Sequence, residues 1–369
     1  MNQTPAPTRP TPPLWRTVFA WGVIPVTLGV GLTVLDHVPG TDISLTVPYA
    51  SEGPGPTFNT LGEVEGTPVI QIEGTDEDPT SGSLDMTTVS VRTGMTFGQF
   101  MYIWLTTGDS IVPIEQIMPP NVSEEEMKEM NKQAFLASES AATVAAMRYL
   151  GKPTRVVVFE VVDKSAADGV VKPGDTITSV GGEKVSEPTE VQKLIQKRAP
   201  GDTVTIGIER SKEDDKEGAL ERREVEVTLG KNEKDASKAF LGISMTSEPV
   251  GDIRVNYNLN DIGGPSAGMM FSLAVIDKLS PGELNGGKNV AGTGTIAENG
   301  DVGPIGGIEH KIVGAKNAGA ELFLAPSDNC AAAAKAKSGD MVIAKVSTIA
   351  DAVKAMEDYA AGRDVITCK

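Results

Sequence analysis

The sequence contains few of the residues on which metal sites and nucleic-acid interfaces depend. Its 369 residues include two cysteines and two histidines, too few for a multi-cysteine zinc framework and a poor basis for a histidine metal site. Lysine and arginine number 33 against 50 aspartates and glutamates, so the net charge is −17. A chain this acidic lacks the basic surface that phosphate backbones require. We therefore expect no metal, no cofactor and no nucleic-acid partner.

Aromatic residues are also scarce, at 5% of the chain, whereas 40 glycines and 24 prolines predict many tight turns. Hydrophobic residues make up 40% of the sequence, which is enough for buried cores and argues against wholesale disorder. At roughly 100–200 residues per domain, the length predicts two or three domains.

Charge is absent from Thr17 to Leu35, a run of 19 residues. At about 1.5 Å per residue this run forms a helix about 28 Å long, which is close to the thickness of a bilayer core. Arg9 and Arg16 precede the run, and the positive-inside bias predicts a cytoplasmic N-terminus with the rest of the chain across the membrane. We expect an uncleaved anchor. A cleaved signal peptide is the alternative, although the run is longer than the usual apolar region of such peptides.

The segments that follow differ in composition and in the secondary structure that they predict. Strands are predicted at 69–73 and 86–92, because β-branched residues gather there. A helix is predicted from the capping box Ser123-x-x-Glu126 to about Leu150. Beyond it, 154–230 holds a buried-strand run, a short amphipathic helix and two alternating strands. From about residue 240 to the end, short strands, glycine turns and alanine-rich helices alternate, as in mixed α and β folds.

The strongest local signal is the hexapeptide GGPSAG at 263–268, which precedes an apolar helix. Its serine, Ser266, would lie among the unpaired N–H groups and at the positive dipole end of that helix. Such N–H groups can bind the oxyanion of a tetrahedral intermediate. The structural alternative is that Ser266 is an ordinary N-cap. A second alternative is the G-x-S-x-G nucleophile elbow, which would need His310 as its base.

A second signal is PIGGIEHK at 304–311, which ends in Lys311, 45 residues after Ser266. First helical turns favour acidic residues over lysines, so Lys311 is an unusual choice there. Burial by Ile305, Ile308 and Ile312 would disfavour its charged form and lower its pKa. A neutral amine can take the proton of a serine hydroxyl, which is the Ser/Lys form of nucleophile activation.

GPSAG, the following T-G turn and the PIGGIxxK segment together resemble the Lon proteolytic domain. The resemblance implies that Ser266 is the nucleophile, that Lys311 is the base and that Thr293 supports the lysine. The other residues around the serine that it implies as supporting are Gly264, Pro265 and Ala267. The helix ending at Leu150 is similar to the family's Ser/Ala-rich helix, with Glu139-Ser140-Ala141 in register. Gly263 stands where the family has an acidic residue.

The stretch VVDKSAADGVVKPGDTITSVGGEKV resembles a PDZ domain of the bacterial protease type. The resemblance implies a peptide groove that binds an extended chain by strand addition. We expect its carboxylate loop at Leu150–Thr154, and a PDZ that serves only as a spacer is the alternative. The groove is expected between the strand carrying Val156, Val157 and Val158 and the helix carrying Val191, Leu194 and Ile195.

The order of these segments resembles the membrane-anchored PDZ-containing Lon-like proteases of the YlbL type. It implies an α+β fold with a Lon-type, ribosomal S5 domain 2-like protease domain and an inserted PDZ, preceded by one transmembrane helix. The implied boundaries are a disordered cytoplasmic tail at 1–13, a transmembrane signal anchor at 14–36, a linker at 37–67, the N-terminal part of the protease domain at 68–150, the PDZ at 151–236, the C-terminal part of the protease domain at 237–362 and a tail at 363–369.

The implied activity is that of an ATP-independent serine endopeptidase at the cell membrane, with its protease and PDZ domains outside the cell. No G-x-x-x-x-G-K-[ST] motif occurs, since Gly286-Gly287-Lys288-Asn289 does not match it, so we expect no ATPase module and no use of ATP. Expected partners are unfolded or extended polypeptides, the membrane and further copies of the chain, because Lon-type domains form rings. The alternative is a catalytically silent PDZ scaffold.

Two further expectations concern packing and oxidation. Because the Lon-like helix and Ser266 flank the PDZ segment, we expect the PDZ to be inserted within the protease fold. Cys330 and Cys368 are the sequence's two cysteines and follow an export segment, so we expect them to form a disulfide.

Overall fold

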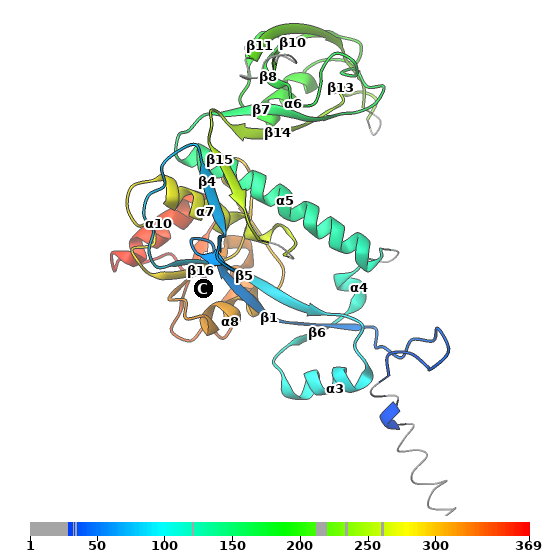
Figure 1. Cartoon of the computed structure of the whole chain (residues 1–369), viewed down its shortest axis with the longest axis vertical. Helices are drawn as coiled ribbons and strands as arrows, with labels where there is room; N and C mark the ends of the chain where they lie inside the picture. The colour runs from blue at the N-terminus through cyan, green and yellow to red at the C-terminus, as the bar shows by residue number, and fades with distance from the viewer. Residues whose placement is uncertain are drawn as a thin grey trace, which may run out of the picture. The chain divides into compact units, whose positions relative to one another are not determined.

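A computed structural model describes residues 29–31, 33, 35–119, 122–211, 220–232, 235–259 and 262–369 (Figure 1). The chain divides into two compact units, one of Met1–Gly55 with Val89–Glu124 and the other of Pro56–Thr88 with Glu125–Lys369. Most of the expected anchor at 14–36, and all of the tail at 1–13, lie outside the described residues. In the described ranges, no helix is both long and apolar enough to cross a membrane.

In the first unit, the beginning of strand β1 (Tyr49–Asn59) pairs with β6 (Ser110–Pro113) in antiparallel register. Helix α3 (Phe97–Thr106) begins at a capping box, in which the Thr96 hydroxyl accepts from the Gln99 N–H and the Gln99 side chain accepts from the Thr96 N–H. This arrangement satisfies two of the N–H groups that a helix start leaves open. The short helix α4 (Ile114–Ile117) follows β6.

Two expected boundaries are wrong in this region. The segment 37–67 is no linker, because it contains β1 and the small hairpin of β2 (Glu63–Val64) and β3 (Thr67–Pro68). Its prolines are compatible with a strand: pairing with β6 ends at Glu52, and Pro56 takes part through its carbonyl, which accepts from the Thr88 hydroxyl. The segment 68–150 is not one piece either, since Val89–Glu124 belongs to the first unit.

The second unit is built on parallel strands. They lie in the order β20-β19-β16-β5, and β5 is followed by β1. The strands are β5 (Ser83–Arg92), β16 (Asn289–Gly292), β19 (Leu322–Pro326) and β20 (Val342–Val346). Parallel strands of this kind are buried on both faces. Leu322 and Leu324 accordingly face one hydrophobic core, whereas Phe323 and Ala325 face another.

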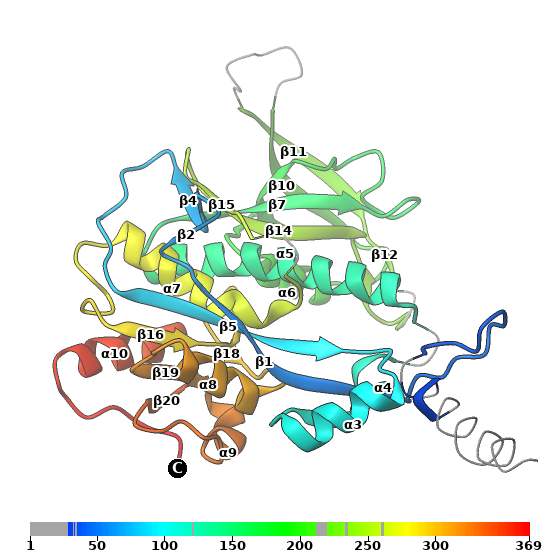
Figure 2. The same cartoon turned by 60° about the horizontal axis from the view of Figure 1, so that its bottom comes forward.

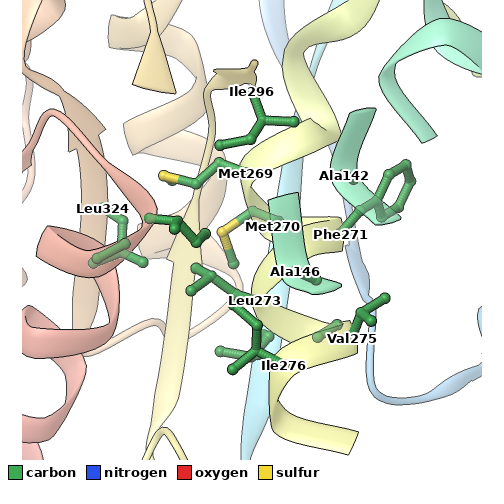
Figure 3. Close-up of a cluster of buried hydrophobic side chains, with 14 of the residues drawn as sticks. Ala142, Ala146, Met269, Met270, Phe271, Leu273, Val275, Ile276, Ile296 and Leu324 are labelled. Carbon is green, nitrogen blue, oxygen red and sulfur yellow. The ribbon is translucent and has the colours of Figure 1, made fainter. Parts of the chain in front are cut away.

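Helices cover both faces of these strands (Figure 2). On one face lie α5 (Glu124–Tyr149), α7 (Gly268–Leu279) and α10 (Ile349–Ala360), whose apolar residues form the larger core. Figure 3 shows Ala142 and Ala146 of α5 beside Phe271 and Met270 of α7. The other face is covered by α8 (Ile308–Asn317) and α9 (Cys330–Ala333).

The PDZ-like segment has a sheet and a core of its own. Its strands lie in the order β11-β10-β8-β7-β14, and helix α6 (Pro188–Gln196) packs on them. The strands are β7 (Thr154–Val161), β8 (Thr176–Val180), β10 (Thr203–Ser211), β11 (Leu220–Thr228) and β14 (Ile243–Pro249). Shorter strands complete it: β9 (Glu183–Lys184), β12 (Gly230–Lys231) and β13 (Ala239–Phe240).

The chain enters this PDZ-like segment from α5 and leaves it into β15 (Arg254–Tyr257), which pairs with β4 (Ile70–Glu73). Both α5 and β15 contribute to the protease core, so the PDZ-like segment is an insertion between two parts of one fold. The PDZ ends later than the expected residue 236, because β14 pairs with β7 as far as Pro249.

The C-terminal tail, expected as a separate segment at 363–369, returns to the sheet. The Lys345 N–H donates to the Ile366 carbonyl at 2.8 Å, and the Cys368 N–H donates to the Ile343 carbonyl at 3.1 Å. Cys368 forms a disulfide with Cys330, the first residue of α9, with a Cα–Cα distance of 4.9 Å. The bond therefore ties the last residues to the layer that contains α8 and α9.

Candidate active site

The loop before α7 is positioned by α5. Gly264 has a φ of +86°, a conformation that favours glycine, and its N–H donates to the Asn131 carbonyl at 2.8 Å. The Ser138 hydroxyl donates to the Pro265 carbonyl at 3.1 Å. Ser266 follows within the short 3-10 helix η2 (Pro265–Ala267). The serine is thereby held at the entrance to α7.

Close packing explains the small residues of this loop. A Cβ at Gly268 would lie 2.6 Å from Ile296 Cγ2 and 2.7 Å from Ser138 Oγ. A Cβ at Gly263 would lie 2.8 Å from Asn131 Cβ. Real Cβ atoms do not approach neighbours this closely, so larger residues would displace the loop from α5.

Ser266 is not the N-cap of a helix. Gly264 caps η2 and Ala267 precedes α7, and neither cap has a side-chain hydrogen bond. The Ser266 hydroxyl instead accepts from Lys311 Nζ at 2.8 Å. The alternative base His310 is the preceding residue of α8, whereas the amine that contacts the serine hydroxyl is that of Lys311.

Lys311 reaches the serine from the first turn of α8. That helix begins after Gly307, which has a φ of +67°, and Ile308 and Ile312 are buried on either side of the lysine. Lys311 itself is 3% exposed, whereas Ser266 is partly exposed. The amine is thus shielded from water while the hydroxyl stays accessible.

Three neutral oxygens surround the lysine amine. Lys311 Nζ donates to Ser266 Oγ at 2.8 Å, to Thr293 Oγ1 at 2.9 Å and to the Thr87 carbonyl at 3.0 Å. None of these oxygens carries a charge, so burial is not offset by a carboxylate. Burial lowers the pKa of Lys311 from 10.5 to about 8.

Thr293 connects the base to the backbone of the nucleophile. Its hydroxyl accepts from Lys311 and donates to the Ser266 carbonyl at 3.1 Å. The Gly294 N–H donates to the same carbonyl at 2.9 Å. Three residues expected from the sequence, Ser266, Thr293 and Lys311, therefore lie in one hydrogen-bonded group.

Sequence reasoning missed the contribution of Thr87. Its carbonyl accepts from Lys311, and its hydroxyl donates to the Gly292 carbonyl at 3.1 Å, which fixes the middle of β5 against the end of β16. The strand was predicted, but no motif marks a backbone carbonyl as a partner of a lysine. The Asn131 carbonyl was missed for the same reason, whereas Ser138, which contributes a side-chain hydroxyl, was missed because no motif singled it out.

Glu139 and Ser140 of the expected Glu139-Ser140-Ala141 motif contribute differently. The Ser140 hydroxyl lies 3.1 Å from Thr246 Oγ1 of β14, so it contacts the PDZ. Glu139 is half-buried, and desolvation raises the pKa of its carboxyl to about 7. The nucleophile loop is contacted instead by the neighbouring Ser138.

The PDZ groove differs from the expected one. Strand β7 pairs with β14 on one edge and β8 on the other, so it has no free edge for an added strand. Val156 and Val158 are buried in the PDZ core, and Val157 is also buried. The expectation is wrong because the strand at the sheet edge is β14, which follows the rest of the PDZ in sequence.

A groove of about 300 Å³ lies between α6 and the segment from β13 to β14. The expected residues Val191 and Ile195 line it, but Leu194 does not. The segment Phe240-Leu241-Gly242 stands at the start of β14, and the expected loop Leu150–Thr154 is not part of the groove. The remaining lining residues are Pro188, Thr189, Gln192, Gln196, Asn232, Ala239, Ile243 and Met245.

Comparison with known families finds the same two kinds of domain, although the PDZ match begins inside α5 and ends before β14. Residues 126–227 match the PDZ domain family, and residues 259–356 match the Lon protease (S16) C-terminal proteolytic domain. The second match contains the loop of Ser266, the turn of Thr293 and the helix of Lys311.

Several curated proteins share part of the sequence. The chain is 28% identical to the Lon protease of Ureaplasma parvum over 50% of its own length and 21% of that protein, and 31% identical to that of Geobacter metallireducens over 51% and 20%. It thus spans about a fifth of these relatives. It is also 38% identical over 73 residues to a probable periplasmic DegP-like serine endoprotease of Bartonella henselae, covering 20% of this chain and 14% of that one.

Among solved structures, the PDZ domain of the SdrC-like protein of Listeria monocytogenes aligns with 26% identity and a TM-score of 0.21, covering 24% of this chain and 85% of that one. The family matches and the Lon relatives identify the two domains. The chain carries a PDZ domain and a serine-protease domain of the Lon S16 type.

Proposed function

We propose that this chain is an ATP-independent serine endopeptidase that hydrolyses unfolded or exported polypeptides through a Ser266–Lys311 dyad. The observation that carries the proposal is the 2.8 Å contact between Ser266 Oγ and an amine that is 3% exposed. Burial brings the pKa of that amine to about 8, so a useful fraction is neutral near neutral pH.

In the first half-reaction, neutral Lys311 takes the Ser266 proton while Oγ bonds to the substrate carbonyl carbon. Backbone N–H groups near Ser266 stabilise the oxyanion. The Gly264 and Met269 N–H groups are not among them, because they donate to the Asn131 and Gly294 carbonyls. The lysine ammonium then gives its proton to the leaving amine as the peptide bond breaks. In the second half-reaction Lys311 activates a water, which releases the acyl group and restores the serine.

Thr293 orients this chemistry without reacting. Its hydroxyl accepts from Lys311 and donates to the Ser266 carbonyl, so it fixes the amine relative to the nucleophile's backbone. Neither Thr293 nor Thr87 brings a negative charge to the amine. The lysine can therefore lose its proton at moderate pH.

Independence from ATP is proposed from the sequence. None of the 369 residues forms a G-x-x-x-x-G-K-[ST] motif, and extended or unfolded chains can reach Ser266 without being unfolded by the enzyme. We further propose a single-pass membrane protein of the YlbL type, with a cytoplasmic N-terminus, extracellular protease and PDZ domains, and assembly with further copies of itself. The 19-residue uncharged run Thr17–Leu35 supports the anchor.

The PDZ groove is proposed to bind an extended peptide along β14. This strand ends the sheet order and has apolar side chains of α6 opposite it, which fits peptide binding by strand addition. The second candidate function, a PDZ scaffold without catalysis, rests on this groove alone and leaves the dyad without a role.

The test uses the full chain in detergent with an unfolded fluorescent protein as substrate. Cleavage without ATP that disappears in Ser266→Ala supports the endopeptidase. Equal cleavage by the wild type and Ser266→Ala, or none by either, favours the scaffold. For the groove, Met245→Glu is compared with Phe159→Glu, which changes an exposed PDZ residue outside the groove. We expect loss of peptide binding in the first variant alone.

A further inference from the structure

Helix α3 is unusual because its apolar side chains face outward. No charged residue occurs from Thr93 to Gly108. Within the helix Ile103 is 2% exposed. In contrast, Tyr102 is 65%, Trp104 61% and Leu105 68% exposed.

The exposed residues form one continuous face. At 3.6 residues per turn, positions 97, 101, 104 and 105 follow the spacing of the apolar stripe that amphipathic helices normally bury. Met101 in this stripe is half-buried, and the exposed Tyr102 borders the stripe beside Leu105. Phe97 of this stripe is 50% exposed, and the opposite side is covered by packing around Ile103 and by the contact between the Phe100 and Tyr49 rings. Exposed apolar patches of this kind mark interaction sites for proteins or membranes.

The start of α3 contacts the end of the uncharged run Thr17–Leu35. The Thr96 hydroxyl donates to the Thr33 carbonyl at 2.9 Å. The same carbonyl is so close to Gly98 that a Cβ there would lie 2.5 Å from it. Thr33 and α3 belong to the same compact unit. The N-terminal end of α3 therefore lies beside the last residues of this run.

We propose that α3 lies in the surface of the lipid bilayer, with Phe97, Tyr102, Trp104 and Leu105 in the boundary between headgroups and acyl chains. The inference rests on the proposed anchor, which would leave the membrane beside α3. Tryptophan and tyrosine favour this boundary, because their rings are apolar and their N–H and O–H groups remain hydrated. Ten residues form a helix of about 15 Å, which is too short to span a bilayer but suits an in-plane position.

Tryptophan positions make the test specific. The chain has three tryptophans, Trp15, Trp21 and Trp104. The full chain is reconstituted in phosphatidylcholine vesicles whose acyl chains carry bromine close to the headgroup, and in matched vesicles without bromine. In one variant, Trp15→Phe with Trp21→Phe, the remaining tryptophan is Trp104 in α3.

In a second variant, Trp15→Phe with Trp104→Phe, the remaining tryptophan is Trp21 in the proposed anchor. Cleavage of the unfolded substrate by both variants shows that they are folded.

We expect the fluorescence intensity of Trp104 to be lower in the brominated vesicles than in the matched vesicles. Its emission maximum should lie at a shorter wavelength than that of the denatured chain. Quenching of Trp21 without quenching of Trp104 overturns the role of α3 and leaves the anchor standing. Absence of quenching at both positions overturns both proposals. If Trp104 is shielded from iodide in solution but is not quenched by brominated lipid, a protein surface such as a second copy covers α3, and the lipid proposal is wrong.

Discussion

Lys311 Nζ donates a hydrogen bond to the main-chain carbonyl of Thr87 at 3.0 Å. A neutral amine has two hydrogens, and the second has an acceptor in Thr293 Oγ1 at 2.9 Å. With these two positions filled, the lone pair of the neutral amine faces Ser266 Oγ at 2.8 Å. The geometry therefore suits a lysine that accepts the serine proton.

Proteolysis should rise with pH as Lys311 loses its proton. Because burial lowers the pKa of Lys311 to about 8, kcat/KM on a small peptide is expected to increase through about pH 8 and level off above it. A pH profile of kcat/KM for the free enzyme measures this value directly. A profile that is flat from pH 6 to about 10 would contradict the assignment of a titrating base.

Ser266 and Lys311 should act as one catalytic unit. Ser266→Ala and Lys311→Ala are each expected to remove most turnover, and the double variant should be scarcely worse than either single one, since members of such a unit are not additive. Lys311→Arg should also be inactive because arginine stays protonated. His310→Ala is the neighbouring control and should keep substantial activity. If His310→Ala were inactive and Lys311→Ala active, the base would instead be the histidine.

Thr293 is expected to act by positioning the amine. Thr293→Val keeps the shape of the side chain but removes both the acceptor for Lys311 and the donor to the Ser266 carbonyl. We expect kcat to fall by roughly 10- to 100-fold, which is what the loss of one or two hydrogen bonds of about 1–2 kcal/mol each implies. Thr293→Ser retains the hydroxyl and should restore much of the rate. Equal losses in Val and Ser variants would point to packing instead.

The dyad also predicts a pH dependence of stability. The folded-state pKa of Lys311 is lowered from 10.5 to about 8, so between these values the unfolded chain binds more protons and stability rises with pH. The penalty for the buried charge, about 3 kcal/mol, is complete below pH 8 and absent above pH 10.5. Lys311→Met lacks it. The free energy of unfolding of Lys311→Met minus that of the wild type, measured in urea, should therefore fall by that amount between pH 7 and 10.5. If the two free energies instead change in parallel with pH, the amine of Lys311 is not buried as a charge.

The residues of the dyad could be predicted because their chemistry depends on short local motifs. A glycine turn, a serine and an apolar helix mark Ser266. Lys311 is marked by its position in the first turn of a helix, where the helix dipole disfavours a positive charge. Their distance could not be predicted by spacing alone, since it depends on how α5, α7 and α8 pack. Thr87 was missed because it contributes a backbone carbonyl, which any residue has.

The PDZ groove was misplaced because strand order in space differs from strand order in sequence. The resemblance to PDZ domains placed the groove at the strand of Val156–Val158, yet apolar strands such as this one are often internal to a sheet. The edge strand β14 lies beyond the charged segment of the PDZ, in Ile243–Pro249, and its alternation is weak. A long-range pairing of this kind leaves no local signature.

Loss of the disulfide should destabilise the C-terminal region. Cys330 and Cys368 are 38 residues apart, and closing a loop of this length stabilises a fold by about 4 kcal/mol on the chain-entropy model. The double variant Cys330→Ser and Cys368→Ser is expected to show this loss in denaturant unfolding. Thiol labelling of the denatured, unreduced wild type is the control, and two labelled cysteines would show that the bond does not form.

The PDZ and the protease domain share a polar contact at the end of α5. Arg148 forms an ion pair with Glu187, the N-cap of α6, at 2.9 Å and lies 3.9 Å from Glu298. The Ser247 hydroxyl of β14 donates to the same Glu298 at 2.6 Å. Glu298 stands in the turn between β17 (Thr295–Ile296) and β18 (Val302–Gly303), shortly after Thr293.

Arg148→Met should therefore loosen the PDZ from the protease domain while leaving each domain folded. The substitution keeps an apolar stem but leaves two carboxylates, each about one-third exposed, without their shared cation. We expect faster cleavage by an added protease at the two crossing segments, 150–153 and 250–253, in a Ser266→Ala background that prevents self-cleavage. Arg223→Met removes an exposed ion pair to Glu221 within the PDZ, which contributes little, and should leave the cleavage rate unchanged. Equal rates in Arg148→Met and Arg223→Met would show that the Arg148 contact does not hold the domains together.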